Sequence, residues 1–535
     1  MIDRIRSDDR SQALPSNIAN GIRAYNACGQ QKAPGSSPGP GLASIKLGTG
    51  SLCASAQIRR HSGSCGANAR RFCGGWGWPA SCDGGHHQDP GPGGHSVDGT
   101  SGNRLSDAEL EYQARALLAQ LTLEEKLNHP LVVPELSKFN FEINTPPLDL
   151  EGRFIGKLHD GLTELWETCR EAAASIGCRI LSIGMLPTLR DTMLNISNIS
   201  SSMRYTAMNR EILELRRQKP LKIKIEGQRE MLGIEHCDVM AEAAATSLQL
   251  HLQVSPAIAA RAYNIAMMLS APSVALAANS PFLFGKELWE ETRIPLFEQA
   301  VWVPAFTDRD GKIVSRVTFD TGYSRHSLLE PFLENLDGFP IILPVISEEK
   351  PERLFHALLH NGTIWRWNRP LIGWGPGGKP HLRIEHRVQA AGPTITDMAA
   401  NAAWFYGATL HLLAEPEGIE HELPFEQAKA NFYAAARHGL QAEVTWRKGK
   451  RVKLSELLSE ELLPGATRSL YKAGVDTHDI EYFLNSVLKR RIESGRTGAA
   501  WQKSFIRRHG NDFRKMTECY YVNQQQQKPV HEWTW

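Results

Sequence analysis

The chain lacks a charge bias, a long apolar run and a secretion signal. Its 535 residues carry a formal net charge of only +2, so charge gives no indication of a nucleic acid or an anionic membrane as partner. No apolar stretch reaches the roughly 20 residues that cross a bilayer, and the opening MIDRIRSDDRSQ has no apolar segment of the secretory kind. We therefore expect a cytoplasmic protein with neither a membrane nor a nucleic acid among its partners.

Cysteine pairs of the CxxC type are also missing, as are the glycine-rich phosphate loops of Walker and Rossmann sites. Five of the nine cysteines lie within the first 82 residues at irregular spacings, which argues against a zinc site. The others are scattered, as expected of reduced thiols. GWGPGG (373–378) is better explained as a hairpin turn between two strands than as a phosphate loop.

Residues 1–103 differ in composition from the rest of the chain. They hold 19 of the 45 glycines and show no apolar periodicity. Such a segment buries too little apolar surface to offset the chain entropy lost on folding, so we predict disorder. It is either a flexible tail or the product of a wrong start or a shifted reading frame, and no motif decides between the two.

Residues 104–130 change to a helical pattern. After the candidate cap Ser106, apolar residues recur at helical intervals, which predicts an amphipathic helix or a junction. The run ARALLAQLTLEEKL (114–127) resembles the opening of a family of glycoside hydrolases. The likeness ends there, and no pair of placed carboxylates for glycoside hydrolysis accompanies it.

Three segments beyond residue 135 alternate between apolar and polar residues, which in a strand places the two kinds on opposite faces. The informative polar positions are Glu142 in KFNFEIN (138–144), Gln249 and His251 in TSLQLHLQV (246–254), and Arg383, Glu385 and Arg387 in HLRIEHRV (381–388). The pattern predicts three half-buried strands of an antiparallel sheet.

The residue types on these polar faces suit ligand binding better than plain solvation. Polar alternation alone is expected of a wet sheet face, but such faces favour Thr, Lys, Ser and Glu. These strands offer His, Gln, Asn, an isolated Glu and an Arg-x-Glu-x-Arg row. Carboxylates and imidazoles can hold a divalent cation, and guanidinium groups bind carboxylate or phosphate. We therefore favour a shared ligand-binding sheet over a solvated one.

Helix signals occur between and after these strands. One predicted helix follows Pro256, a second begins near Thr396, and a third runs from Pro424 and ends at Gly439. Strands and helices that do not alternate regularly predict an α+β fold with an antiparallel sheet.

At these segments the chain resembles the second type of bacterial glutamate-cysteine ligases, a family that also includes carboxylate-amine ligases. The likeness runs in order through FNFEINTPPLDL (139–150), TSLQLHLQV (246–254), AANSPFLFGKELWEETRIPLFEQ (277–299), HNGTIWRWNRP (360–370), HLRIEHRVQAAGPTITDMAANAAWFYG (381–407) and RTGAAWQ (496–502). The series predicts a ligase domain over residues 131–515 and a flexible tail over 516–535.

The resemblance implies a glutamine synthetase-like fold, in which a curved antiparallel sheet has helices on one side and a polar face that binds ATP, Mg²⁺ and an amino acid. It implies a ligase that phosphorylates the side-chain carboxylate of glutamate with ATP and then lets an amine such as cysteine displace the phosphate. Metal ions and arginines must offset the charge on the transferring phosphoryl group. Small molecules are thus the expected partners, and the oligomeric state stays open.

The resemblance also assigns roles position by position. It implies that the metal or nucleotide-phosphate ligands are Glu142, His251 and Glu385. It implies a catalytic row of Arg383, Glu385 and Arg387, in which the arginines hold substrate carboxylate or phosphate. Further candidates for substrate binding are Gln249, Asn279, Arg293 and Arg369.

One element of the family pattern is missing. Members usually begin with a strand that carries two acids one residue apart, close behind a glycine. Glu109 and Glu111 have this spacing, but they lie in the helical pattern without that glycine. We therefore expect an unpaired sheet edge and a metal site that lacks carboxylates. This departure favours a second interpretation, a catalytically silent relative that binds an amino acid or a nucleotide.

Overall fold

The computed structural model describes residues 129–535 except 305, 308–310, 312, 417 and 535, together with the backbone of two short strands, Ile22–Arg23 and Ala43–Leu47. The predicted α+β class is confirmed. The predicted helix within residues 104–130 and most of the predicted disordered segment lie outside the described residues. Within the described part of the chain, no helix is long and apolar enough to cross a membrane.

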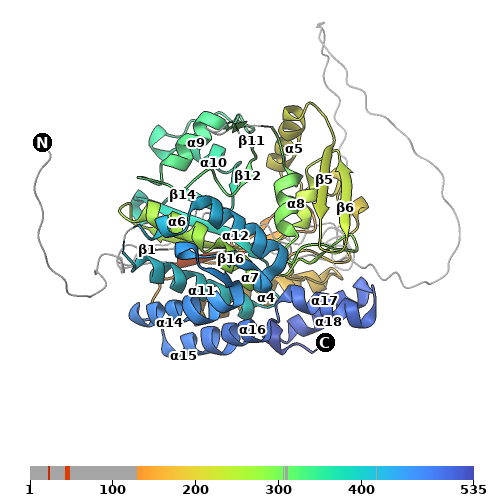
Figure 1. Cartoon of the computed structure of the whole chain (residues 1–535). Coiled ribbons are helices and arrows are strands. Elements are labelled where there is room, and N and C mark those ends of the chain that lie inside the picture. Colours follow the sequence, from red (N-terminus) through yellow and green to blue (C-terminus); the bar gives the residue numbers. More distant parts are fainter. Residues whose placement is uncertain are drawn as a thin grey trace, which may run out of the picture. The chain divides into compact units, whose positions relative to one another are not determined.

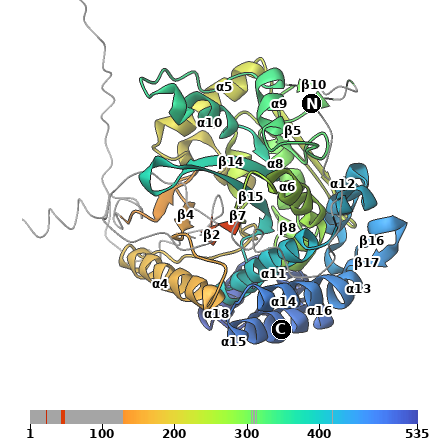
Figure 2. The same ribbon diagram turned by 90° about the vertical axis from the view of Figure 1, so that its left-hand side faces the viewer.

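A seven-stranded antiparallel sheet lies at the centre of the described structure (Figure 2). Its order is β14 (Asn368–Trp374), β15 (Pro380–Ala390), β7 (Ser247–Val254), β2 (Ala43–Leu47), β4 (Phe141–Asn144) and β3 (Val132–Pro134), and β1 (Ile22–Arg23) also pairs with β7. The three predicted strands are confirmed as β4, β7 and β15. GWGPGG forms the predicted turn between β14 and β15.

Helices cover the apolar face of this sheet. They are α6 (Ala259–Met268) and α7 (Ser270–Ala277), where one continuous helix was predicted, and α11 (Ile395–Leu413), which begins near Thr396 as predicted. Leu250 and Ile384 of the sheet are fully buried beneath this layer, and the Tyr406 hydroxyl of α11 donates to the His251 carbonyl at 3.1 Å. Helix α12 (Phe425–His438) ends at Gly439, which adopts a positive φ of 56°.

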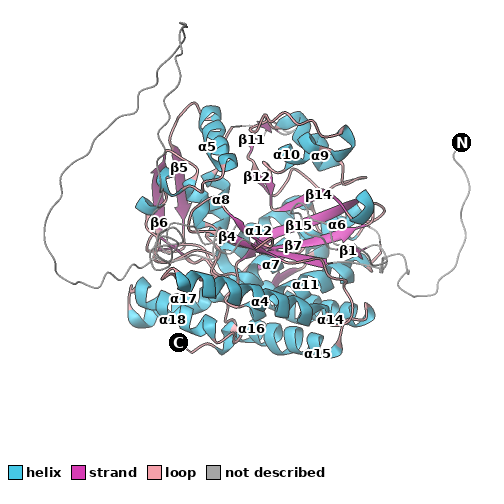
Figure 3. Ribbon diagram, turned by 180° about the vertical axis from the view of Figure 1, so that it is seen from behind, coloured by secondary structure: helices cyan, strands magenta, loops and turns pink. Residues whose placement is uncertain are grey.

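The remaining elements surround this core. In all three ribbon views α14 and α5 lie on opposite sides of the sheet (Figures 1 and 3). The other helices are α4 (Phe154–Ser175), α5 (Met203–Leu215), α8 (Arg293–Ala300), α9 (Glu330–Gly338), α10 (Phe355–Asn361), α13 (Leu454–Leu457), α14 (Leu463–Lys472), α15 (Thr477–Ile480), α16 (Lys489–Ser494), α17 (Gly498–His509) and α18 (Phe513–Gln525). The longer of the other strands form two hairpins, β5 (Leu221–Glu226) with β6 (Met231–His236) and β16 (Glu443–Thr445) with β17 (Arg451–Lys453).

The expected unpaired sheet edge is wrong. Strand β2 lies between β7 and β4 and pairs with both, with Ser44 opposite His251 and Lys46 opposite both Gln249 and Asn144. This strand lies within residues 1–103, where disorder was predicted, and most of that segment lies outside the described residues. The alternation of ASIKL suits a strand, but its glycine-rich surroundings hide it. The sheet is continuous, and β2 contains no carboxylate.

The expected half-burial of the strands is wrong as well, because both faces are buried. On the polar face, Glu142 is 3% exposed and His251 and Glu385 are each 1% exposed. Helix α8 and the short helix η3 (Met240–Ala244) contribute side chains to a cavity at one end of this face. A solvated polar face is thereby excluded.

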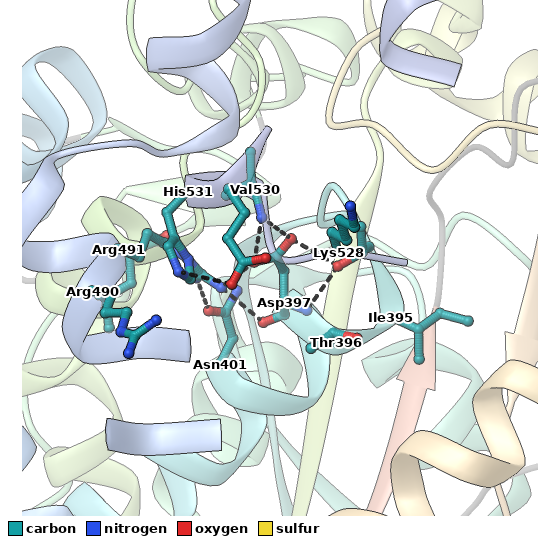
Figure 4. A network of polar contacts seen from close by, with 12 residues as sticks. Ile395, Thr396, Asp397, Asn401, Arg490, Arg491, Lys528, Val530 and His531 are labelled. Atoms are coloured by element: carbon teal, nitrogen blue, oxygen red, sulfur yellow. Dashed lines mark hydrogen bonds and ion pairs between the residues drawn. The ribbon is translucent and has the colours of Figure 1, made fainter. Parts of the chain in front are cut away.

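The expected flexible tail after residue 515 is instead folded. Helix α18 packs on the core, and Gln524 within the glutamine run donates to the carbonyls of Ser182 and Pro393. Figure 4 shows the contacts that hold the C-terminal residues in place. Asp397 accepts a hydrogen bond from the Val530 backbone N–H at 3.0 Å and forms an ion pair with buried Arg491 at 2.6 Å. A glutamine run predicts disorder only when nothing binds its amides.

Substitution of Trp533 tests whether the C-terminal residues stabilise the fold. Trp533 is 2% exposed and packs edge-on against Trp501 and Tyr520 at 5.4 and 4.9 Å. We expect Trp533→Ala to lower the free energy of unfolding by roughly 3 to 5 kcal/mol, as for other buried large aromatics. Val522→Ala on α18, at a site 57% exposed, is the control and should change it by less than about 0.5 kcal/mol. Chemical denaturation measures both, and equal effects would contradict a packed C-terminus.

Candidate functional site

Three side chains from adjacent strands form a row on the polar face. Strand register sets Glu385 opposite Arg369 of β14 and opposite His251 of β7. The Arg369 Nε lies 2.6 Å from Glu385 Oε2, and His251 Nε2 lies 3.4 Å from Glu385 Oε1. Three residues that are far apart in the sequence thus meet around one buried carboxylate.

A β-bulge follows directly in β15. The ladder shifts between His386 and Gln389, so Arg387 and Val388 together oppose Gln249. A bulge bends its strand and re-aims side chains. Arg387 Nη1 lies 3.1 Å from Glu385 Oε2 and 3.5 Å from Gln249 Oε1. The Val388 carbonyl accepts a hydrogen bond from Arg293 of α8, so the bulge links both guanidinium groups to the site.

These groups border a small cavity. Its lining residues are Glu242, Ala245, Ser247, Arg293, Phe297, Trp367 and Arg387. Burial lowers the pKa of Arg293 to about 10, whereas the charge of Glu291, 3.6 Å away, opposes this shift. Burial raises the pKa of Glu242 to about 7, although Arg387 opposes this shift. The cavity therefore brings two guanidinium groups, each paired with a glutamate, beside a carboxyl group whose pKa is raised by burial.

Trp367 forms the aromatic wall of this cavity. The guanidinium carbon of Arg293 lies 5.3 Å from the ring centroid, within the range of a cation–π contact. The indole Nε1 donates to Glu298 Oε1 at 2.9 Å, and the Tyr433 hydroxyl donates to the same oxygen at 2.8 Å. Trp367 also packs edge-on against Phe297, with ring centroids 5.8 Å apart, so it contributes both to the core and to the border of the cavity.

Carboxylates gather at the β4 end of the polar face. Tyr205 donates to Glu135 Oε2 at 3.3 Å. Burial and the nearby charges of Glu135, Glu242 and Glu142 raise the pKa of this tyrosine. Mg²⁺ prefers such oxygen ligands and keeps water or phosphate oxygens in its other positions. Carboxylates of this region could therefore contribute single oxygen ligands to a divalent cation.

The expected metal ligands do not form a compact group. Among the residues that the structure describes, only Asp476, His478 and Asp479 bring three ligand atoms within 4.8 Å of one another. Of the expected set, His251 and Glu385 are neighbours, whereas Glu142 lies on β4, beyond β2. Arg383 lies two residues before Glu385 in β15, with Gln253 as its partner in the register.

Asn279 does not join the site. Its Nδ2 donates to the Ala391 carbonyl at 2.8 Å and to the Tyr520 hydroxyl at 2.9 Å, and its Oδ1 accepts from Gln502 at 2.9 Å. The side chain is fully buried between the end of β15 and the C-terminal helices. Its amide is therefore engaged in joining these elements.

Sequence reasoning missed Glu242 and Glu135. Glu242 lies in MAEAAA, a run that reads as helix, and only the turn from η3 into β7 brings it to the cavity. Glu135 directly follows β3, a strand too short to show alternation. The pairing of Val133 with Glu142 could have indicated that Glu135, two residues on, shares the face of Glu142.

Replacement of Glu298 by glutamine tests the electrostatics behind the cavity. Burial raises the pKa of Glu298 to about 7, so the folded protein binds this proton more tightly than the unfolded chain does. Its contribution to stability is therefore complete below the ordinary pKa of 4.5 and is lost as pH rises towards 7. We expect Glu298→Gln to flatten this part of the pH profile of unfolding, since the amide stays neutral. An unchanged profile would contradict the raised pKa.

A family model described as "Glutamate-cysteine ligase family 2(GCS2)" matches residues 98–529. No curated protein matches the chain. Among solved structures, the glutamate–cysteine ligase of Francisella tularensis in complex with AMP is 14% identical over 78% of this chain and 85% of its own, with a TM-score of 0.48.

Two further solved structures are similar over much of the chain. A bifunctional glutathione synthetase from Pasteurella multocida is 12% identical over 75% of this chain and 49% of its own, with a TM-score of 0.43. The Pup ligase PafA in complex with ADP is 11% identical over 80% of this chain and 77% of its own, with a TM-score of 0.33. The family match covers most of the sequence, and the chain therefore belongs to the glutamate-cysteine ligase family 2.

Proposed function

We propose that this protein is an ATP-dependent ligase that joins the side-chain carboxylate of glutamate to cysteine or a related amine. The observation that carries the proposal is the row of Arg369, Glu385 and Arg387, in which Glu385 and Arg387 are buried, with Arg293 beside it across the bulge. Phosphoryl transfer needs fixed positive charge more than a nucleophilic side chain. Since ATP and a free amino thiol are the substrates, we also propose that the protein acts in the cytoplasm.

The residues of the site divide into roles under this proposal. Arg387 and Arg293 bind the carboxylate of the amino acid at the cavity, and Gln249 orients it. Arg369 and Arg383 bind nucleotide phosphate along β14 and β15. Glu385 holds Arg369 and Arg387 in place through one oxygen, which keeps their planar groups in a defined orientation before substrate arrives.

The reaction follows from this arrangement. The substrate carboxylate attacks the γ-phosphorus of ATP, the bond to the bridging oxygen breaks, and ADP leaves. The amine then attacks the acyl carbon and expels phosphate, and the amine loses one proton. Glu142, with Glu135 and Glu242 nearby, would contribute ligands to Mg²⁺, which would offset phosphate charge when bound.

A second candidate function is supported by the sequence of β2. This strand lies in the middle of the sheet, between β7 and β4, yet ASIKL supplies no carboxylate. A site with fewer acids neutralises a metal-bound nucleotide less well. A silent relative would therefore still bind nucleotide or amino acid but would not turn over.

Release of ADP from the purified protein tests the ligase proposal. We expect turnover with ATP, Mg²⁺ and glutamate that depends on cysteine or another amine. Glu385→Gln should reduce it by at least about 100-fold, because the neutral amide no longer holds two arginines in register. The matched control is Glu422→Gln, which removes a carboxylate that pairs with Arg447 and Lys448 at 2.7 and 3.1 Å outside the site.

The outcomes separate the candidate functions. Amine-dependent turnover that Glu385→Gln abolishes and Glu422→Gln spares supports the ligase. A folded protein whose melting temperature rises with MgATP but which turns over no carboxylate and amine supports the silent relative. Turnover that survives in Glu385→Gln would refute the assigned row.

A further inference from the structure

We propose that His386 is a positioning residue of this site, which fixes the bulge of β15 from the helix-covered face and so aims Glu385 and Arg387. The idea rests on the proposed function for its catalytic consequence. It concerns a residue that touches neither substrate nor nucleotide, because His386 lies on the opposite face of the sheet from the arginine row.

His386 is held on three sides. Its Nδ1 lies 2.7 Å from Asn368 Oδ1 of β14, and its Nε2 lies 2.8 Å from the Ser273 hydroxyl of α7. Its ring stacks on Phe405 of α11 at 4.1 Å with an interplanar angle of 13°. The side chain is fully buried. One residue of the sheet is thereby fastened to the neighbouring strand and to two helices.

The hydrogen bonds define the protonation of this imidazole. Asn368 Nδ2 donates to the Ser270 hydroxyl at 3.0 Å, so its Oδ1 faces His386 and accepts. His386 Nδ1 must then carry the proton, and Nε2 accepts from Ser273.

Asn368 is itself fastened to a buried ion pair. The Tyr263 hydroxyl lies 2.9 Å from the Asn368 carbonyl and 2.5 Å from Asp320 Oδ2, and Asp320 pairs with fully buried Arg366. Asp320 adopts a positive φ of 77°, a backbone conformation that a non-glycine residue holds only where its surroundings enforce it. The anchor of His386 is thus a rigid network.

The position of His386 in the strand register connects this anchor to Glu385 and Arg387. Asn368 opposes His386, and the next pair along β14 and β15 is Arg369 with Glu385. The bulge begins directly after His386. A bulged strand loses regular ladder contacts there, and a slip of one residue would turn every side chain to the other face. Fixing His386 therefore fixes which face Glu385 and Arg387 occupy.

Two variants and a control test the proposal. His386→Phe keeps a ring on Phe405 but removes both hydrogen bonds, whereas His386→Gln can donate to Asn368 and accept from Ser273. Asn431→Ala is the control, because Asn431 is 3% exposed and holds Thr445 through two hydrogen bonds of 2.7 and 3.1 Å outside the site. For each protein we would measure thermal unfolding, amide hydrogen exchange of residues 383–390, the affinity for MgATP, and kcat with KM for the amino acid.

We expect His386→Phe to speed exchange in residues 383–390 and to lower kcat by about 100-fold, as small misplacements of reacting groups do. His386→Gln should restore the slow exchange and the kcat of the wild-type protein. Asn431→Ala should change neither exchange in residues 383–390 nor kcat, even where it lowers the melting temperature as much as His386→Phe does. Unchanged exchange in His386→Phe, or equal kinetic effects in His386→Phe and Asn431→Ala, would overturn the proposal. If the wild-type protein turns over no substrate, the proposed function fails, and the exchange pattern still decides the role of His386.

Discussion

The arrangement of the site depends on one buried carboxylate that serves two guanidinium groups. Glu385 Oε2 is within 3.1 Å of both Arg369 and Arg387. Like charges so close would repel each other in a low-dielectric interior without this shared counter-charge. Glu385 thus allows the sheet to keep concentrated positive charge away from water. Under the proposed function, substrate anions would meet fixed dipoles and charges that need no rearrangement.

The two faces of the sheet have complementary tasks. The polar face presents charge, whereas the helix-covered face holds the strands that present it. The fixed network of Arg366, Asp320 and Tyr263 ends at the Asn368–His386 pair, one residue away from Arg369 and Glu385. The bulge then directs the Val388 carbonyl to Arg293, which ties α8 to the site. Side chains of a binding site keep a defined geometry when packed helices and strands support them rigidly.

Much of this could be predicted from local patterns. Alternation in β4, β7 and β15 is a period-two signal, and it revealed both the strands and the residues that share the polar face. The contact between Arg293 and the bulge could not be predicted, because one extra residue in a strand ladder does not alter the amino-acid composition. Strand β2 was hidden by its glycine-rich neighbours. Asn279 lies within a family-like motif, yet its environment is set by helices more than two hundred residues later.

The most direct test of the account follows the oxygen atoms of the substrate. An acyl phosphate places one oxygen of the substrate carboxylate between carbon and phosphorus, and displacement by the amine carries that oxygen into inorganic phosphate. With glutamate labelled by ¹⁸O in its side-chain carboxylate, mass spectrometry of the released phosphate should show one label for each amide formed. Phosphate without label, released while ADP accumulates, would mean that water attacks ATP at this site and would contradict a ligase.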